Sequence, residues 1–126
     1  MFRKCLILGV LMRKNMNDLQ KEINYITDVV VASCLTIMSC KGEPIVTREE
    51  ILSKSKKRPV VKARNILCFA LHRYHFETLT ICNWLHCTPS AVSKMVAKHA
   101  EYKKIDRAYL LACKSIKMTI ENTDDV

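Results

Sequence analysis

Turn-forming residues are scarce in this chain, which holds 2 glycines and 3 prolines among 126 residues. Because glycine and proline punctuate most tight turns, their scarcity favours helices joined by short loops. No glycine-rich phosphate loop occurs in the sequence, which excludes nucleotide hydrolysis of the P-loop kind. The histidines and cysteines form no recognisable nucleophile signature, so we expect a protein that is not an enzyme.

Acidic residues are few beside the basic ones, 12 against 21, and the net charge is +9. Such an excess favours a polyanionic partner, since a positive field attracts nucleic acid and anionic membranes alike. Hydrophobic residues make up 49% of the chain, which is enough to bury a core within one domain and argues against wholesale disorder.

No hydrophobic run is long enough to span a bilayer. The apolar run at residues 5–12, within MFRKCLILGVLMRKN, mimics a signal peptide, but it is short and no small-residue cleavage site follows it. A helix-opening pattern begins just after Met16, which makes this methionine an alternative start. We expect a soluble intracellular protein.

Paired CxxC motifs are also absent, although the chain has 7 cysteines. Their odd number and scattered positions indicate reduced thiols that act as small apolar residues inside a cell. Cys68, His72 and His75 lie four and three residues apart on one expected helix, which raises zinc as an alternative. Three ligands on one helix are unusual for structural zinc, so we expect no metal and no cofactor.

Helical spacing runs through the first two thirds of the chain. Apolar residues recur at intervals of three and four from the expected N-cap, Asn17, to a break at SCKGEP, which predicts one long, largely buried helix. Thr47 and Glu50 have the spacing of a capping box at the start of a short helix. After Pro59 a helix is expected to resume near Val60, with this apolar stripe: Ala63, Ile66, Leu67, Ala70, Leu71 and Tyr74.

The segment ETLTICNWLHCTPSAVSKMVAKHA, residues 77–100, predicts a helix-turn-helix. The first, short amphipathic helix is indicated by Leu79, Ile81, Trp84 and Leu85. HCT forms the turn, and Thr88 and Pro89 suit the N-cap and first position of the second helix. Its inward residues should be Val92, Met95, Val96 and His99. Its outer face, small enough to approach base edges and basic enough to bind phosphates, should hold Ser90, Ala91, Ser93, Lys94, Ala97 and Lys98.

A basic loop comes shortly before this motif. KSKKRPVVKAR, residues 54–64, holds six basic side chains and no acid, and Pro59 disfavours a helix before it, so residues 54–58 should form a loop. Clustered cations repel one another unless they are solvated or bind an anion, and a nuclear-localisation run would look similar. The position of the loop favours a clamp on the DNA backbone or in the minor groove.

A final amphipathic segment covers residues 102–120, with Ile105, Tyr109, Ala112 and Ile116 at helical spacing. We expect this helix to pack on the domain or to form a surface for a protein partner or a second copy of the chain. The acidic tail ENTDDV follows and is expected to fray.

The stretches TREEILSKSKKRPVVKARNILCFAL and LTICNWLHCTPSAVSKMVAKH together resemble the C-terminal DNA-binding domain, domain IV, of the bacterial replication initiator DnaA. The resemblance covers roughly residues 20–100, and ILSKSKKRPVVKAR is its best part. It implies an all-α, Trp-repressor-like helical bundle containing a helix-turn-helix, and double-stranded DNA as the partner. The initiator's ATPase domain has no counterpart here, so we expect a stand-alone DNA-binding protein of a phage, a mobile element or a small bacterial regulator, located in the cytoplasm at the nucleoid.

The resemblance also implies which residues contact DNA. Lys56 aligns with an arginine that enters the minor groove, and Lys54, Lys57 and Arg58 lie beside it. Lys62 and Arg64 align with positions that contact phosphate. The family's base-reading signature, Asp-His-Thr-Thr, is replaced by Thr88, Pro89, Ser90 and Ala91, and later contacts fall to Lys94 and Lys98.

Two departures limit what the resemblance implies. The missing signature predicts that the binding mode carries over while the sequence preference differs. His86 replaces the glycine usual in the turn, and histidine is among the residues that tolerate left-handed backbone. The alternative hypothesis is a protein-interaction module that keeps the scaffold and has lost DNA reading. In either case we expect an N-terminal extension (1–16), a binding domain (17–100) and an additional C-terminal helix and tail (101–126), with no membrane partner and no small-molecule substrate.

Overall fold

The computed structural model describes residues 16–40 and 46–121, which form six α-helices and no strand. This confirms the all-α expectation for the described part of the chain. The expected N-terminal extension, most of the SCKGEP break and the acidic tail lie outside it. None of the described helices is long and apolar enough to cross a membrane. The helices are α2 (Met16–Cys40), α3 (Arg48–Ile51), α4 (Arg58–Arg73), α5 (Thr78–Leu85), α6 (Pro89–Ile105) and α7 (Arg107–Glu121).

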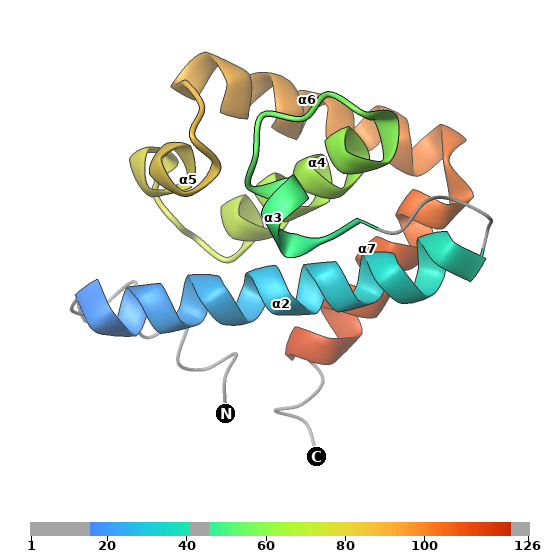
Figure 1. Ribbon diagram of the computed structural model, residues 1–126, viewed down its shortest axis with the longest axis horizontal. Helices are drawn as coiled ribbons and strands as arrows, with labels where there is room; N and C mark the ends of the chain where they lie inside the picture. Colours follow the sequence, from blue (N-terminus) through green and yellow to red (C-terminus); the bar gives the residue numbers. More distant parts are fainter. Residues whose placement is uncertain (1–15, 41–45, 122–126) are drawn as a thin grey trace.

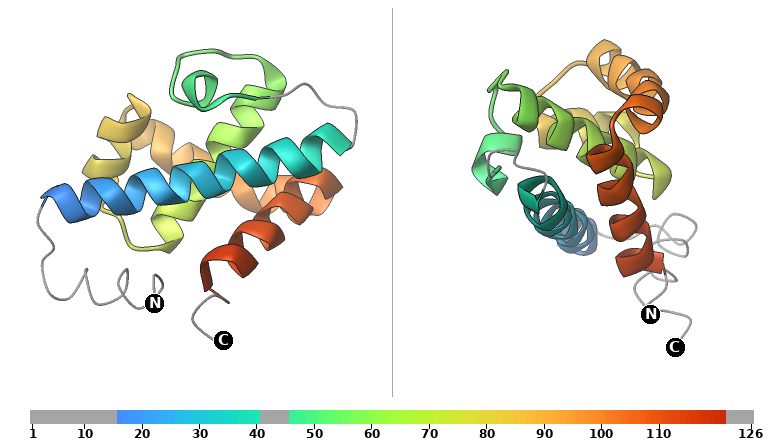
Figure 2. Two further views of the ribbon diagram at one scale, coloured as in Figure 1. Left: turned by 60° about the horizontal axis from the view of Figure 1, so that its bottom comes forward. Right: turned by 90° about the vertical axis from the view of Figure 1, so that its right-hand side faces the viewer.

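The longest helix, α2, lies along one side of the molecule, and α7 runs at an angle to it (Figures 1 and 2). Its buried face repeats every three or four residues, as Ile23, Ile26, Val30 and Cys34. This face packs against α7 and α4. The described helix covers Met16–Cys40, which confirms the prediction of one long helix.

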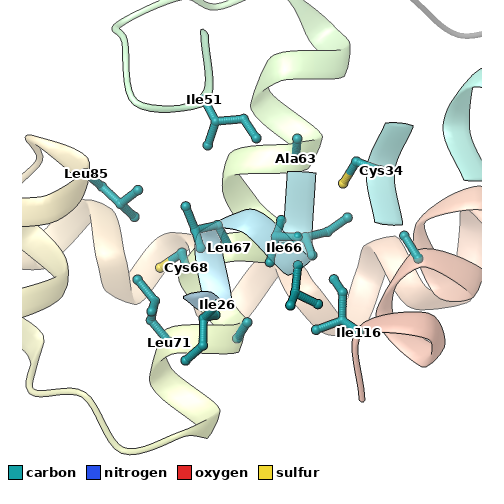
Figure 3. Close-up of a cluster of buried hydrophobic side chains, with 14 of the residues drawn as sticks. Ile26, Cys34, Ile51, Ala63, Ile66, Leu67, Cys68, Leu71, Leu85 and Ile116 are labelled. Carbon is teal, nitrogen blue, oxygen red and sulfur yellow. The ribbon is translucent and has the colours of Figure 1, made fainter. Parts of the chain in front are cut away.

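The central helix is α4, which contacts each of the other five described helices. Its predicted apolar stripe is buried in full: Ala63, Ile66, Leu67, Ala70, Leu71 and Tyr74. Figure 3 shows Ile66 and Leu67 among side chains from α2 and α7, including Ile26 and Ile116. Each fully buried aliphatic side chain contributes about 1.5–3 kcal/mol to stability, so this stripe accounts for much of the core.

Local signals set the starts of two helices as predicted. Thr47 caps α3, because its hydroxyl accepts the Glu50 amide at 3.2 Å while a Glu50 carboxylate oxygen accepts the Thr47 amide at 3.1 Å. Thr88 caps α6 by accepting the Ala91 amide, and Pro89 occupies the first turn. The start of α4 comes two residues earlier than expected, at Arg58, since Pro59 fits the first turn of a helix.

The C-terminal segment differs from the expected single helix at residues 102–120. α6 continues to Ile105, then Asp106 takes an extended conformation and α7 begins at Arg107. Ile105 is therefore 81% exposed, whereas Tyr109, Ala112 and Ile116 are buried as predicted. The expected boundary at residue 100 falls inside α6, and α7 belongs to the same core as the other helices.

Asp106 sets this break. One carboxylate oxygen accepts the Tyr109 amide at 3.1 Å, which caps α7, and the other lies 2.7 Å from Lys62 Nζ of α4. Both side chains are largely buried, at 18% and 10% exposed. Burial alone would raise the pKa of Asp106, but Lys62 and the Tyr109 amide hold it below its ordinary 3.8.

Replacing Asp106 by asparagine should therefore destabilise the protein by about 2–3 kcal/mol, because a buried lysine loses its counter-charge while the cap can persist. Urea unfolding at neutral pH measures this loss. The control is Asp28→Asn: Asp28 pairs with Arg48 at 2.6 Å but is 68% exposed, so its removal should cost less than about 1 kcal/mol.

The loss of stability in Asp106→Asn should also depend on pH in one direction. A carboxylate whose pKa is lowered by folding stabilises the protein above its unfolded pKa, and this contribution is lost as the pH falls through the folded value. The difference in stability between wild type and Asp106→Asn should thus be full at neutral pH and shrink only below pH 3.8. A difference that shrank between pH 7 and pH 5 would contradict the assigned role of Asp106.

Candidate nucleic-acid interface

The basic loop joins α3 to α4 and exposes a group of cations. Lys54, Lys56 and Lys57 lie in the loop and Arg58 opens α4, and all four side chains are exposed. Within residues 16–40 and 46–121, none of the four has an ion pair. The predicted loop is confirmed, apart from Arg58 belonging to the helix.

Arg64 holds this loop from beneath. Its guanidinium donates to four backbone carbonyls: Ile51 at 2.8 Å, Ser55 at 3.0 Å, Glu50 at 3.2 Å and Ser53 at 2.7 Å. Two of these carbonyls belong to the last two residues of α3 and two to residues that follow it, where backbone acceptors need partners. Burial lowers the pKa of Arg64, but an arginine remains charged at any physiological pH.

Two hydrogen bonds from backbone amides to serine hydroxyls also lie within the loop. Ser53 Oγ accepts the Ser55 amide at 3.1 Å, and Ser55 Oγ accepts the Lys57 amide at 3.3 Å. With Arg64 on the carbonyls and serines on the amides, both kinds of backbone group in the loop have partners. The lysine side chains therefore project from a backbone of defined shape.

Lys62 and Arg64, the two expected phosphate contacts, do not lie among the four exposed cations of the loop. Lys62 is 8% exposed and pairs with Asp106, while Arg64 is half-buried against the loop backbone. Sequence spacing could not reveal this difference. All six cations lie within eleven residues, yet the partners that separate them come from elsewhere in the chain.

The turn between α5 and α6 has the conformation expected of it. His86 adopts left-handed backbone, with φ 55° and ψ 50°, and the Cys87 amide donates to the Cys82 carbonyl at 3.0 Å. Histidine thus occupies a position where glycine carries no steric penalty. In α5, Ile81 and Leu85 are buried and Trp84 partly so, but Leu79 is 67% exposed and does not face the core.

The outer face of α6 is small and basic, as predicted. Five of its residues are exposed: Ser90, Ser93, Lys94, Ala97 and Lys98. Ala91 is half-buried, and the exposed Thr88 uses its hydroxyl for the cap. The inward residues also agree, since Val92 and His99 are buried and Met95 and Val96 pack partly against the core.

The basic loop and the first turns of α6 lie at the same end of the molecule. Figure 1 and the right-hand view of Figure 2 both show them at the top, beyond α4 and away from α2. The loop and the start of α6 therefore lie on the side of the molecule that α2 does not cover.

Behind α6 lies a polar network that the sequence did not indicate. Asn65 Nδ2 donates to the Tyr109 hydroxyl at 2.9 Å, and this hydroxyl lies 2.8 Å from His99 Nδ1. The His99 ring stacks on Phe69, with ring centroids 3.5 Å apart. Burial and then the nearby charge of Lys103 lower the pKa of His99 to about 4, so the imidazole is neutral at physiological pH.

The zinc alternative finds no geometry to support it. Cys68 is buried, His72 and His75 are exposed, and no three potential ligands cluster as a metal site in the described part of the chain. Burial, followed by Cys87 and Cys82, raises the pKa of Cys68 to about 12.

Comparisons with known proteins add no family. No protein-family model matches the chain, and no curated protein and no solved structure matches it.

Arg64→Lys should loosen the basic loop, because an ammonium on a flexible stem cannot satisfy four carbonyls in the fixed geometry of a guanidinium. We expect faster hydrogen exchange at the Ser55 and Lys57 amides and a stability loss of about 1.5–3 kcal/mol. Arg58→Lys is the matched control, since it is the same substitution at an exposed residue. Equal exchange rates in the two variants would contradict the holding role of Arg64.

Proposed function

We propose that this protein binds double-stranded DNA, with α5, its turn and α6 acting as a helix-turn-helix and the basic loop gripping phosphate or the minor groove. The observation that carries the proposal is the loop itself: four exposed cations without an ion pair in the described chain, on a backbone held by Arg64. Cations that neutralise phosphates release counterions, which supplies most non-specific affinity for DNA.

The chemistry of α6 supports an approach to base edges. An α-helix fits the major groove of B-DNA, and small side chains at its start allow close contact. Ser90 offers a hydroxyl that can donate or accept, while Lys94 and Lys98, one turn apart, can reach guanine acceptors or phosphates. The N-terminus of this helix also favours a phosphate through its dipole, although Pro89 has no N–H and the Ala91 amide is bonded to Thr88.

The resemblance to domain IV of DnaA supports the same arrangement on a Trp-repressor-like bundle. In this proposal Lys56 enters the minor groove, and Lys54, Lys57 and Arg58 contact phosphates beside it. Because Lys62 and Arg64 have internal partners, we assign them supporting roles behind the contact surface. With no Asp-His-Thr-Thr signature, sequence preference would depend on Ser90, Ala91 and Lys94. The proposed role is the control of replication or transcription at the bacterial nucleoid.

Lys56→Ala should weaken binding to every duplex by a similar factor, because phosphate and minor-groove contacts of a lysine carry little sequence information. The logarithmic slope of affinity against salt should become shallower by about one unit. Fluorescence anisotropy on random and selected duplexes over a range of salt measures both. Lys21→Ala on the exposed face of α2 is the charge-matched control and should leave the slope almost unchanged.

Changes on α6 should behave differently. Ser90→Ala and Lys94→Ala should alter which duplexes are enriched from a random pool, with each lost base contact worth about 1–3 kcal/mol of discrimination. Arg64→Ala should weaken binding to all sequences by releasing the loop. Unchanged affinity in all four variants, Lys56, Arg64, Ser90 and Lys94, would sink the proposal.

A protein-interaction module is the second candidate, favoured by one specific observation. Leu79 of α5 is 67% exposed, and the same helix contributes Thr80 and Trp84, with Leu19 of α2, to a surface cavity of about 290 Å³. A folded protein without measurable affinity for any duplex at moderate salt, but with a protein partner lost on Leu79→Ser, would select this function over DNA binding.

A further inference from the structure

A cavity of about 250 Å³ opens between α4, α6 and α7. Its wall is largely apolar and is built from Ile66, Phe69, Ala70, Leu110 and Ile116. Its remaining lining includes four basic residues, contributed by all three helices: Arg73, Lys103, Lys114 and Lys117. Apolar walls with a few convergent polar groups are the usual features of a small-molecule site.

The charge balance of the cavity is positive. Its neighbouring acid, Glu121, is already bound, because Arg73 Nε donates to Oε2 at 3.0 Å and the Tyr74 hydroxyl donates to the same oxygen at 2.6 Å. Burial acts to raise the pKa of Glu121, but these two bonds outweigh it and leave the pKa below its ordinary value. Lys103, Lys114 and Lys117 have no ion pair in the described part of the chain.

His99 belongs to a buried polar network beside the cavity. Asn65 Nδ2 donates to the Tyr109 oxygen, and the same hydroxyl lies 2.8 Å from His99 Nδ1, where the tautomer of the imidazole decides which group donates. A neutral imidazole whose Nδ1 accepts must carry its proton on Nε2. His99 is 6% exposed and lines the cavity, and its Nε2 has no hydrogen-bond partner among the described residues.

We propose that this cavity binds a small organic anion, with a flat apolar body against α4 and α7 and an acid group toward Lys103, Lys114 and Lys117. The volume is slightly below the range of roughly 300–1,000 Å³ found for drug-sized ligands, which favours a compact molecule of one or two rings. Basic residues contributed by three helices favour an anion in this cavity.

The cavity is distinct from the proposed DNA surface. It takes the C-terminal half of α4 and, from α6, His99 and Lys103, whereas the basic loop meets the opposite end of α4 and neither Lys94 nor Lys98 lines the cavity. An apolar concave wall also suits a compact ligand better than a phosphate backbone, which is polar along its whole length. The proposal therefore does not depend on DNA binding.

The test uses the full chain without DNA and naphthalene-2-carboxylate as the probe, followed by two-dimensional amide NMR. We expect saturable shift changes centred on Ala70, Leu110 and Cys113, three residues that line the cavity on α4 and α7. Naphthalene-2-carboxamide has nearly the same shape without the charge and should bind distinctly more weakly. No saturable binding of the carboxylate, or equal binding of the amide, would overturn the proposal.

Matched lysine variants locate the charge effect. Lys103→Gln should weaken binding of the carboxylate about threefold or more, which is the size of effect expected when a partly solvent-exposed ion pair is lost. Binding of naphthalene-2-carboxamide should be unaffected. Lys104→Gln removes the same charge from the neighbouring residue, which is exposed and does not line the cavity, and should have no effect. Equal losses in both variants, shifts centred on residues 54–57, or displacement of the probe by a short duplex would each overturn the assignment.

Discussion

The structure depends on the burial of two cations on its central helix. α4 packs against every other described helix, and a cation that is buried along such a helix needs a partner. Lys62 meets this constraint through Asp106, and Arg64 meets it through carbonyls at the end of α3 and just after it. One partner lies at the junction of α6 and α7, and the other forms the basic loop. The same constraint thus fixes both the path of the C-terminal helices and the shape of the proposed DNA-binding loop.

Much of the fold could be predicted from the sequence because its signals are local. The capping box at Thr47, the Thr88–Pro89 start of α6 and the left-handed turn at His86 each depend on residues within four positions of one another. The apolar stripe of α4 was equally clear, since spacing alone defines one face of a helix.

What the sequence could not supply were partners far apart in the chain. No residue near Asp106 in the sequence indicates that this side chain forms an ion pair with Lys62, which lies 44 residues earlier. The break before α7 was therefore not predicted. Leu79 and Ile105 fit an apolar spacing but have no helix packed over them. For the same reason, Lys62 and Arg64 could not be separated from the exposed lysines by inspection. No sequence motif indicates the cavity between α4, α6 and α7 either, because three separate helices contribute to it.

The hydrogen bonds around the basic loop have a consequence for the speed and cost of recognition. A flexible loop loses conformational entropy when it closes on a ligand, at about 0.5–1.5 kcal/mol for each side chain immobilised and more for the backbone. Here Arg64, Ser53 and Ser55 have already ordered that backbone during folding. In the proposed complex the DNA would meet a formed surface, so association should be limited by diffusion and charge attraction rather than by a rearrangement of the loop.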